Sequence, residues 1–167
     1  MAPRTHQMVI AVAGAGSCDE VQSALAEAAG AEIAGRGAVV ACAGGGGIAL
    51  AAARGAKAAG GTTLGILPGA SAQESPPNPH IDIAIFTGLA EGRTLIEIAS
   101  ADALLAVGGG FSTLAEIALA LRAKKPVVLL ESWRFEMSDA RPNVPRATQA
   151  AEAVALLFTA LATTSAG

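Results

Sequence analysis

The residues best suited to chemistry in this sequence are Arg93 and Glu116, together with a glycine turn and two hydroxyl residues between them. The three glycines at 108–110 permit a sharp turn that approaches a ligand closely, because no Cβ intervenes. Ser112 and Thr113 follow and offer side-chain oxygens that can cap a helix N-terminus. Such a turn directs backbone N–H groups and the positive end of a helix dipole at one spot. The ligand that this arrangement favours is an anion, most often a phosphate.

Glu116 lies three residues after Thr113, and two interpretations of that spacing stay open. A capping box has the same spacing: Thr113 would bond a backbone N–H group and Glu116 would reach back. Alternatively, a carboxylate one turn into a helix at a phosphate-binding turn points near a bound sugar. There it could accept hydrogen bonds from ribose hydroxyls, or assist departure of a base as a general acid or base.

Arg93 is the only lysine or arginine between Lys57 and Arg122, and it stands where a strand gives way to a helix. In α/β sheets this edge is where ligands bind, and the guanidinium fork suits phosphate or carboxylate. An ion pair with Glu97, four residues later on the same helix, is the alternative. We expect the ligand role.

Short apolar runs alternate with helical segments along the chain. Strands are predicted at residues 7–13, 38–42, 62–67, 81–86, 103–107 and 127–130, and helices at 17–34, 48–59, 93–100, 112–121 and 148–162. Residues 68–79 and 131–143 read as irregular segments. Strands that are apolar on both faces and alternate with helices predict an α/β fold with a mostly parallel sheet covered on both sides. With no linker or internal repeat, residues 1–167 are predicted to form one domain.

Glycines also follow the first predicted strand. Gly14 and Gly16 match the first half of a GxGxxG dinucleotide-binding motif, but Asp19 stands at the third glycine position. The acidic residue expected about 20 positions later is missing too, since residues 41–43 read Ala-Cys-Ala. These departures disfavour NAD binding. A plain strand-to-helix turn, with Ser17 as the helix cap, still leaves this loop able to contact a nucleotide.

Four glycines at 44–47 follow the second predicted strand. Such a run is costly to order, so a ligand pressing against the backbone is one explanation. Close packing of a helix on the sheet is the other. No Lys-Ser or Lys-Thr pair follows, so the run is not a P-loop, and ATP hydrolysis by that route is disfavoured.

Composition limits the class of protein. Of the 167 residues 52% are hydrophobic and 15% charged, which excludes disorder and suggests that some apolar surface is buried between subunits. A net charge of −3 without a basic run, and only 3% aromatic residues, disfavour nucleic-acid binding. Cys18 and Cys42 lack metal-ligand spacing and indicate thiols in a reducing cytoplasm; no metal site is predicted. No signal peptide or membrane-spanning run is evident.

These motifs carry a family resemblance. The segments GGGGIALAAARGAKAAGG, LGILPG, Gly92-Arg93, SADALLAVGGG and FSTLAEIALAL resemble, in order, the molybdenum cofactor carrier protein family. That family belongs to the superfamily of the Lonely-Guy (LOG) phosphoribohydrolases, often misannotated as lysine decarboxylases. The resemblance covers about residues 8–130. It implies a Rossmann-like three-layer αβα fold, a cytoplasmic homo-oligomer (dimer or tetramer) and a ligand cleft at the carboxyl ends of the strands.

The two branches imply different functions. Carriers bind the phosphate-bearing pterin molybdenum cofactor without turnover, whereas the hydrolases cleave the N-glycosidic bond of a nucleoside monophosphate such as AMP, using an arginine and a glutamate in a PGGxGTxxE signature. Gly108 at the proline position is carrier-like, Ser112 departs from the glycine of both branches, and Thr94 differs from the residue that either branch has after the arginine. Arg93 and Glu116 match the enzyme's catalytic pair, so the resemblance leaves enzymatic activity open.

We therefore expect a carrier of the molybdenum cofactor or of an AMP-like nucleotide, with phosphoribohydrolase activity as the alternative. The residues expected to bind the ligand are Gly14, Gly16, Ser17, Gly44, Gly45, Gly46, Gly47, Arg93, Gly109, Gly110, Ser112, Thr113 and Glu116. The runs at 44–47 and 109–113 are expected to form two facing anion-binding turns, with Arg93 neutralising the phosphate.

Overall fold

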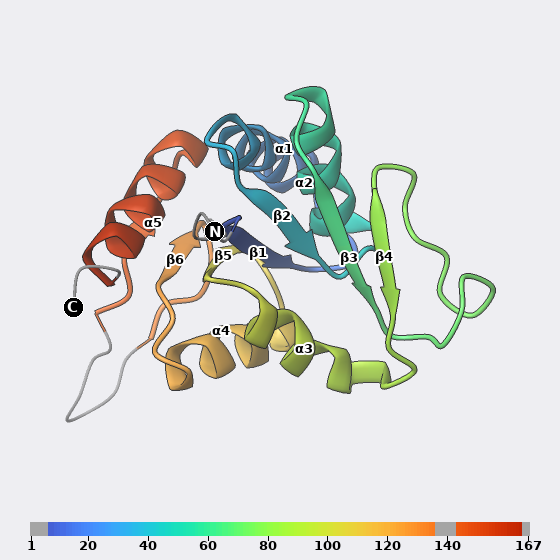
Figure 1. The fold of residues 1–167 in the computed structure, drawn as a ribbon. Coiled ribbons are helices and arrows are strands. Elements are labelled where there is room, and N and C mark those ends of the chain that lie inside the picture. Colours follow the sequence, from blue (N-terminus) through green and yellow to red (C-terminus); the bar gives the residue numbers. More distant parts are fainter. Residues whose placement is uncertain (1–6, 136–142, 165–167) are drawn as a thin grey trace, which may run out of the picture.

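A computed structural model describes residues 7–135 and 143–164 of the chain. Seven strands form one sheet in the order β4-β3-β2-β1-β5-β6-β7, and every recorded pairing is parallel (Figure 1). The strands are β1 (Val9–Gly14), β2 (Val39–Cys42), β3 (Thr63–Leu67), β4 (Ile83–Phe86), β5 (Ala103–Val107), β6 (Val127–Leu130) and β7 (Arg146–Ala147). The predicted α/β fold is confirmed.

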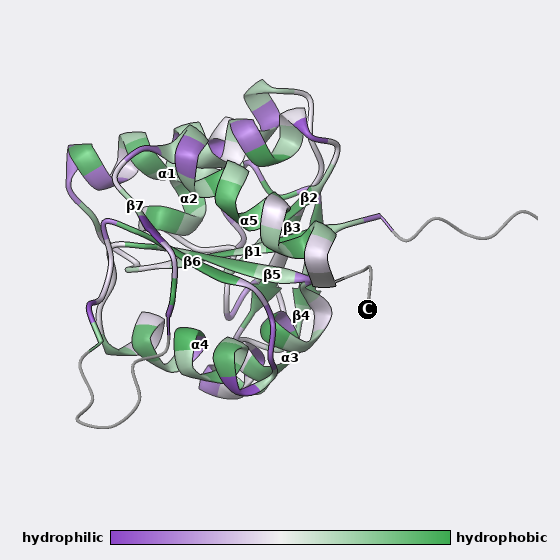
Figure 2. Cartoon of the chain, turned by 90° about the vertical axis from the view of Figure 1, so that its left-hand side faces the viewer, coloured by the Kyte–Doolittle hydropathy of each residue, from purple (hydrophilic) through white to green (hydrophobic). Residues whose placement is uncertain are grey.

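Helices cover both faces of the sheet and make the three layers visible in Figure 2. They are α1 (Glu20–Gly35), α2 (Gly47–Ala58), α3 (Arg93–Ser100), α4 (Phe111–Arg122) and α5 (Ala150–Thr164), with a short 3-10 helix, η1 (Ala90–Gly92), before α3. Helices α1, α2 and α5 lie on one face, and α3 and α4 lie on the other (Figures 1 and 2). None of these helices has the length and hydropathy that crossing a bilayer requires.

Successive residues along the strands pack into two separate hydrophobic cores, one on each face of the sheet. Ile10 and Val12 of β1 belong to the core beneath α1, α2 and α5, while Ala11 and Ala13 belong to the core above α3 and α4. Residues of β1, β2, β5 and β6 are almost entirely buried, as strands covered on both faces must be. The near-continuous apolar runs of the sequence follow from this arrangement.

The chain reverses its direction of travel across the sheet next to β1. It runs outward from β1 through β2 and β3 to β4, and then returns to place β5 on the other side of β1. The loop after β1 leads to α1 on one face, and the loop after β5 leads to α4 on the opposite face (Figure 1). Such a switch point opens a crevice at the carboxyl ends of the strands, where ligands of α/β proteins bind.

Several predicted boundaries need correction. Asp19, not Ser17, caps α1: its carboxylate accepts a hydrogen bond from the backbone N of Gln22 at 2.8 Å. Helix α5 begins at Ala150, two residues later than predicted. The segment predicted as irregular at 131–143 lies partly outside the described residues, and just after it two residues pair with β6 as β7. A strand of two residues is too short for any periodicity to reveal it.

Helices α1 and α2 cross at two glycines. A Cβ on Gly30 would overlap the carbonyl oxygen of Ala52, and a Cβ on Gly55 would overlap that of Glu27. The backbones therefore touch directly, which explains why two helix interiors accept a residue that costs about 1 kcal/mol relative to alanine.

We predict that Gly30→Ala lowers the free energy of unfolding by about 2 kcal/mol or more, because overpacking at a backbone contact forces the helices apart. Gly35→Ala is the matched control: it is in the same helix, and nothing lies within 4 Å of its would-be Cβ. Urea denaturation measures both variants. Equal stability of the two would show that the crossing tolerates a methyl group.

Candidate functional site

The glycine turn after β5 delivers the chain to α4. Gly108 and Gly109 have positive φ values of 54° and 108°, a backbone region that side-chain-bearing residues rarely adopt. A Cβ on Gly108 would also lie 2.6 Å from the Gln22 Nε2 atom. Gly110 is the N-cap of α4 and provides no side-chain cap. The prediction that Ser112 or Thr113 caps this helix is therefore wrong, because the glycine turn already supplies the extended residue before the first helical turn.

The N-terminus of α4 leaves a run of donors without partners. Within the described residues, the backbone N–H groups of residues 109–113 have no hydrogen-bond acceptor. The Thr113 side chain is fully buried, and its Oγ1 atom also lacks a partner there. It lies against the turn, since a Cβ on Gly109 would be 2.5 Å from Thr113 Oγ1. A buried hydroxyl and several amide donors without acceptors are what an anion would satisfy.

Residues after β6 brace this turn from the other side. Ser132 Oγ donates a hydrogen bond to the Gly108 carbonyl at 2.5 Å, and Trp133 Nε1 donates one to the Gly110 carbonyl at 3.2 Å. The Trp133 ring also contacts Phe111, with ring centroids 6.0 Å apart. No sequence pattern points to Ser132 or Trp133, because they lie in a segment without periodicity and act through hydrogen bonds to the backbone.

Arg93, the first residue of α3, lies between two carboxylates. Its Nη1 atom donates to Glu97 on the same helix, and its Nη2 atom donates to Glu116 Oε1 on α4 at 3.3 Å. Glu97 is 1% exposed and Glu116 is 4% exposed. The predicted pair with Glu97 is thus present, and Glu116 joins it. Glu116 does not reach back to a cap, so the capping-box interpretation is wrong.

Burial dominates the acidity of both glutamates. Burial raises the pKa of Glu97 to about 7, helped by the negative charge of Glu116 and opposed by Arg93. Burial also raises the pKa of Glu116, again opposed by Arg93. With one guanidinium and two carboxylates, the cluster is net negative when both glutamates are ionised. This Arg93–Glu97–Glu116 group is called the buried triad below.

A hollow of about 670 Å³ opens between the N-terminal ends of α3 and α4. Arg93, Thr94, Phe111 and Ser112 are among the residues that line it, with Pro68 from the end of β3. Glu116 does not line this hollow, and only 14% of the Arg93 side chain is exposed. Arg93 thus contributes to the wall of the hollow, whereas neither Glu97 nor Glu116 does.

The glycines at 44–47 are explained largely by contacts within the chain. Gly44 and Gly47 have positive φ values of 76° and 57°, and a Cβ on Gly47 would overlap the carbonyl oxygen of Ala15. Asn78 Nδ2 donates to the Gly44 and Gly45 carbonyls at 3.2 and 2.9 Å, which ties the 68–79 loop to this run. The run therefore accommodates close packing, and its binding role stays a prediction.

The loop after β1 packs against the same glycine run. A Cβ on Gly14 would overlap the Ile48 side chain, and a Cβ on Gly46 would lie 3.2 Å from the Gly16 carbonyl. Gly16 and Ser17 are exposed. Helix α2 leaves this run on the opposite face of the sheet from α4 (Figures 1 and 2). The two predicted glycine turns thus share the carboxyl edge, but their helices lead away to different layers.

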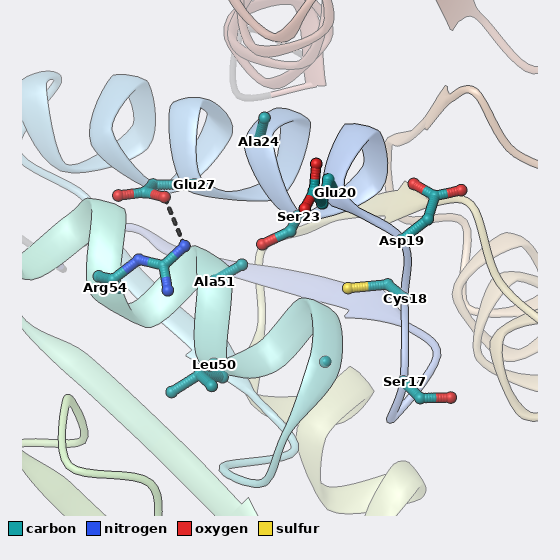
Figure 3. Close-up of a pocket in the computed structure, with 11 residues that line it drawn as sticks. Ser17, Cys18, Asp19, Glu20, Ser23, Ala24, Glu27, Leu50, Ala51 and Arg54 are labelled. Atoms are coloured by element: carbon teal, nitrogen blue, oxygen red, sulfur yellow. Dashed lines mark hydrogen bonds and ion pairs between the residues drawn. The ribbon is translucent and has the colours of Figure 1, made fainter.

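Figure 3 shows a second hollow, of about 510 Å³, between α1 and α2. Ser17 and Cys18 lie at one end and Arg54 lies at the other, where it forms an ion pair with Glu27 at 2.5 Å. The charged side chains that line this hollow are mostly acidic, as in the buried triad, but they are largely exposed to solvent. The other thiol, Cys42, is buried, and burial raises its pKa to about 12. No group of three or more His, Cys, Asp or Glu side chains among the described residues could hold a metal ion.

Comparison with known proteins places this geometry in a family. Residues 7–158 match the SLOG cluster4 family. The chain belongs to this family. A molybdenum cofactor binding protein from Rippkaea orientalis is 32% identical, with a TM-score of 0.84 over 93% of this chain and 98% of that one. The Moco carrier protein of Chlamydomonas reinhardtii is 39% identical, with a TM-score of 0.84 over 95% and 99%. An uncharacterized protein from Archaeoglobus fulgidus is 40% identical over 81% of this chain and 93% of its own length.

These neighbours confirm the resemblance to molybdenum cofactor carrier proteins and the Rossmann-like fold of this SLOG cluster4 member. The Rippkaea and Chlamydomonas proteins align with nearly the whole chain.

The buried triad predicts a pH dependence of stability. Because the folded state raises the pKa of Glu97 from about 4.5 to about 7, it binds a proton more tightly than the unfolded chain. The stabilisation is therefore complete below pH 4.5 and is lost as the pH rises to 7, by about 3 kcal/mol. Glu97→Gln lacks this titration. We expect its stability advantage over the parent protein to grow by that amount between pH 4.5 and 7.5, as measured by urea denaturation. A constant difference would contradict the assignment.

Proposed function

We propose that this chain binds the molybdenum cofactor and carries it without chemical turnover. The phosphate of the ligand would accept hydrogen bonds from the backbone N–H groups of residues 109–113 and from Thr113, and Arg93 would neutralise its charge. The remainder of the ligand would occupy the hollow between α3 and α4. Two structural neighbours, from Rippkaea and Chlamydomonas, are a molybdenum cofactor binding protein and a carrier protein, which supports this ligand.

The observation that carries the proposal is the unpartnered hydroxyl of Thr113. A buried hydroxyl without a partner costs about 1–3 kcal/mol, and a protein core offers cheaper residues such as valine of nearly the same shape. Thr113 Oγ1 lies beside a turn whose amide donors are likewise without described acceptors. A phosphate has enough acceptor oxygens to satisfy the hydroxyl and several amides together. The residues present therefore fit a phosphate group.

The position of Glu116 favours a carrier over a hydrolase. A general acid must come within hydrogen-bond reach of the atom that it protonates, about 3 Å. Glu116 is 4% exposed, is hydrogen-bonded to Arg93 and does not line the hollow, whereas Arg93 does. In this arrangement the arginine meets the ligand while the carboxylate is withheld from it.

A nucleoside 5′-monophosphate phosphoribohydrolase is the alternative, and one observation favours it. Glu116 contacts Arg93, and burial raises the pKa of Glu116, which suits a group that donates a proton near neutral pH. This reaction requires Arg93 to move aside when the ligand enters, so that Glu116 reaches the base.

A homo-oligomer remains an expectation. The large apolar side chains that are exposed on α3 and α4 are Leu95 at 60% and Phe111 at 83%. Both line the hollow, so a second subunit against these helices would cover the proposed ligand.

We predict opposite effects of Thr113→Val on binding and stability. Removing the hydroxyl should weaken binding of AMP and inorganic phosphate about tenfold or more, because a charge-assisted hydrogen bond is lost. The same change should leave the ligand-free protein equally or more stable, since no partner of the hydroxyl is lost. Isothermal titration calorimetry and urea denaturation measure the two quantities. A loss of stability with unchanged affinity would reject the proposed phosphate site.

Arg93→Lys tests the guanidinium while keeping the charge that the two glutamates need. We expect about tenfold weaker binding of AMP and of molybdate, because a single ammonium group cannot hold Glu116 and the anion in the fixed geometry of a guanidinium fork. Arg54→Lys, in the exposed pair with Glu27, is the matched control and should bind as the parent does. Equal affinity in all three proteins would exclude Arg93 from the site.

The hydrolase alternative predicts release of adenine from AMP. We expect none above the level of Glu116→Gln, which removes the acid but keeps the shape of the side chain. Chromatography of the reaction mixture measures free adenine. Release by the parent protein that disappears in Glu116→Gln would establish the enzyme and overturn the carrier proposal.

A further inference from the structure

The buried triad contains one carboxylate more than the anion site requires. An arginine that serves a phosphate needs at most one carboxylate to position it, and Glu116 occupies that place on Nη2. Glu97 bonds Nη1, so both sides of the fork are already taken by the chain itself. Glu97 is also the less exposed of the two glutamates, at 1%. Burying a second carboxylate beside one guanidinium is costly, so its presence calls for an explanation.

An arriving anion makes this electrostatic conflict worse. With both glutamates ionised, a phosphate would be a third negative group against a single guanidinium, in an interior where charges are poorly screened. Both terminal nitrogens of the arginine already face a carboxylate, so an anion at either nitrogen would lie close to a like charge. One carboxylate must therefore lose its charge or its place when the ligand binds.

We propose that Glu97 is the internal counter-ion of the anion site: the phosphate of the ligand takes its place on Arg93, and Glu97 takes up one proton from solvent. This inference rests on the proposed function, because it requires an anion at Arg93. The overall step is a balanced binding equilibrium in which protein, anion and one proton combine. The only bond formed is the O–H bond of the protonated Glu97 carboxyl, and Glu116 keeps its hydrogen bond to Nη2.

The surroundings identify Glu97, and not Glu116, as the group that accepts the proton. Helix α3 packs against α4, β1, β3 and η1. The only charged residues on these elements, besides those of the triad, are Glu91 of η1 and Arg122 of α4, and both are exposed. Cys42 of β2 is the other titratable group near Glu97, and it stays a neutral thiol. The charge of Glu116 raises the pKa of Glu97, and Glu97 titrates near neutrality.

Protonated Glu97 remains compatible with the site. A neutral carboxylic acid can still donate or accept a hydrogen bond, and burial favours the neutral form. Protonation of Glu97 removes one negative charge from the triad. The guanidinium and the amide donors of the turn then face only two negative groups, Glu116 and the ligand. Affinity for an anion should therefore fall as the pH rises above 7, where Glu97 holds its proton less readily in the free protein.

Sulfate is the probe of choice, because it stays doubly negative across the neutral range, whereas the phosphate of AMP titrates near pH 6. Calorimetric titrations at pH 6, 7 and 8.5 would compare the parent protein with Glu97→Gln. In the parent, sulfate affinity should fall about tenfold from pH 7 to 8.5, as one linked proton requires. Glu97→Gln should change less than twofold and bind more tightly than the parent at pH 8.5. Glu27→Gln, at the exposed pair with Arg54, is the matched control and should follow the parent.

Repeating the titration at pH 8.5 in buffers of different ionisation enthalpy counts the protons directly. The parent should take up close to one proton per sulfate, and Glu97→Gln close to none. A flat pH profile in the parent, or an equal slope in Glu97→Gln, would overturn the role of Glu97 and leave the anion site standing. If neither protein binds sulfate even at pH 6, the proposed phosphate site fails, and the role of Glu97 fails with it.

Discussion

A single guanidinium balances two carboxylates beneath the carboxyl edge of the sheet, and the arrangement of α3 and α4 depends on it. Arg93 is the first residue of α3. Its hydrogen bond to Glu97 links it to the second turn of the same helix, and its hydrogen bond to Glu116 links it to α4. Removing the positive charge would leave two buried carboxylates uncompensated, a change that typically costs several kcal/mol. The arginine is thus needed for the packing of this layer, whether or not a ligand is bound.

The same arginine lines the hollow between α3 and α4, so it contacts both the buried glutamates and the candidate ligand site. Next to it the β5–α4 turn carries amide donors and the Thr113 hydroxyl, none of which has a described acceptor. Donors and charge are therefore assembled before any ligand arrives, so that binding requires little rearrangement of the backbone. Ser132 and Trp133 hold the turn from β6, and this restricts the glycines that would otherwise move freely.

The sequence predicted the fold better than it predicted the local caps. The alternation of apolar runs and helices was enough for the parallel sheet, since strands buried on both faces leave a clear pattern. Arg93 and Glu116 were found from charge and position, but their direct contact was not, because residues 23 apart meet only through the packing of α3 on α4. The predicted helix caps were wrong because a neighbouring residue occupies the N-cap position. Asp19 caps α1 in place of Ser17, and Gly110 is the N-cap of α4 in place of Ser112 or Thr113. The glycines at 44–47 show what the sequence alone cannot distinguish. Close packing within the chain and close approach of a ligand both require glycine, so its presence does not tell the two apart.

A carrier and a hydrolase place different demands on an arginine–glutamate pair. Hydrolysis requires the acid to reach the leaving group, so the carboxylate must be exposed to the ligand at some stage of the reaction. A carrier requires the opposite: the ligand must meet donors and positive charge while reactive groups stay away from it. Here Arg93 lines the hollow, and neither of the two buried glutamates does. Glu97 holds Arg93 at Nη1 in the ligand-free protein, and in the proposed complex the phosphate takes that place while Glu116 keeps Nη2. An acceptor thus holds the arginine beside Glu116 in both states, which opposes the movement that catalysis would need and is the physical reason to prefer transport over turnover.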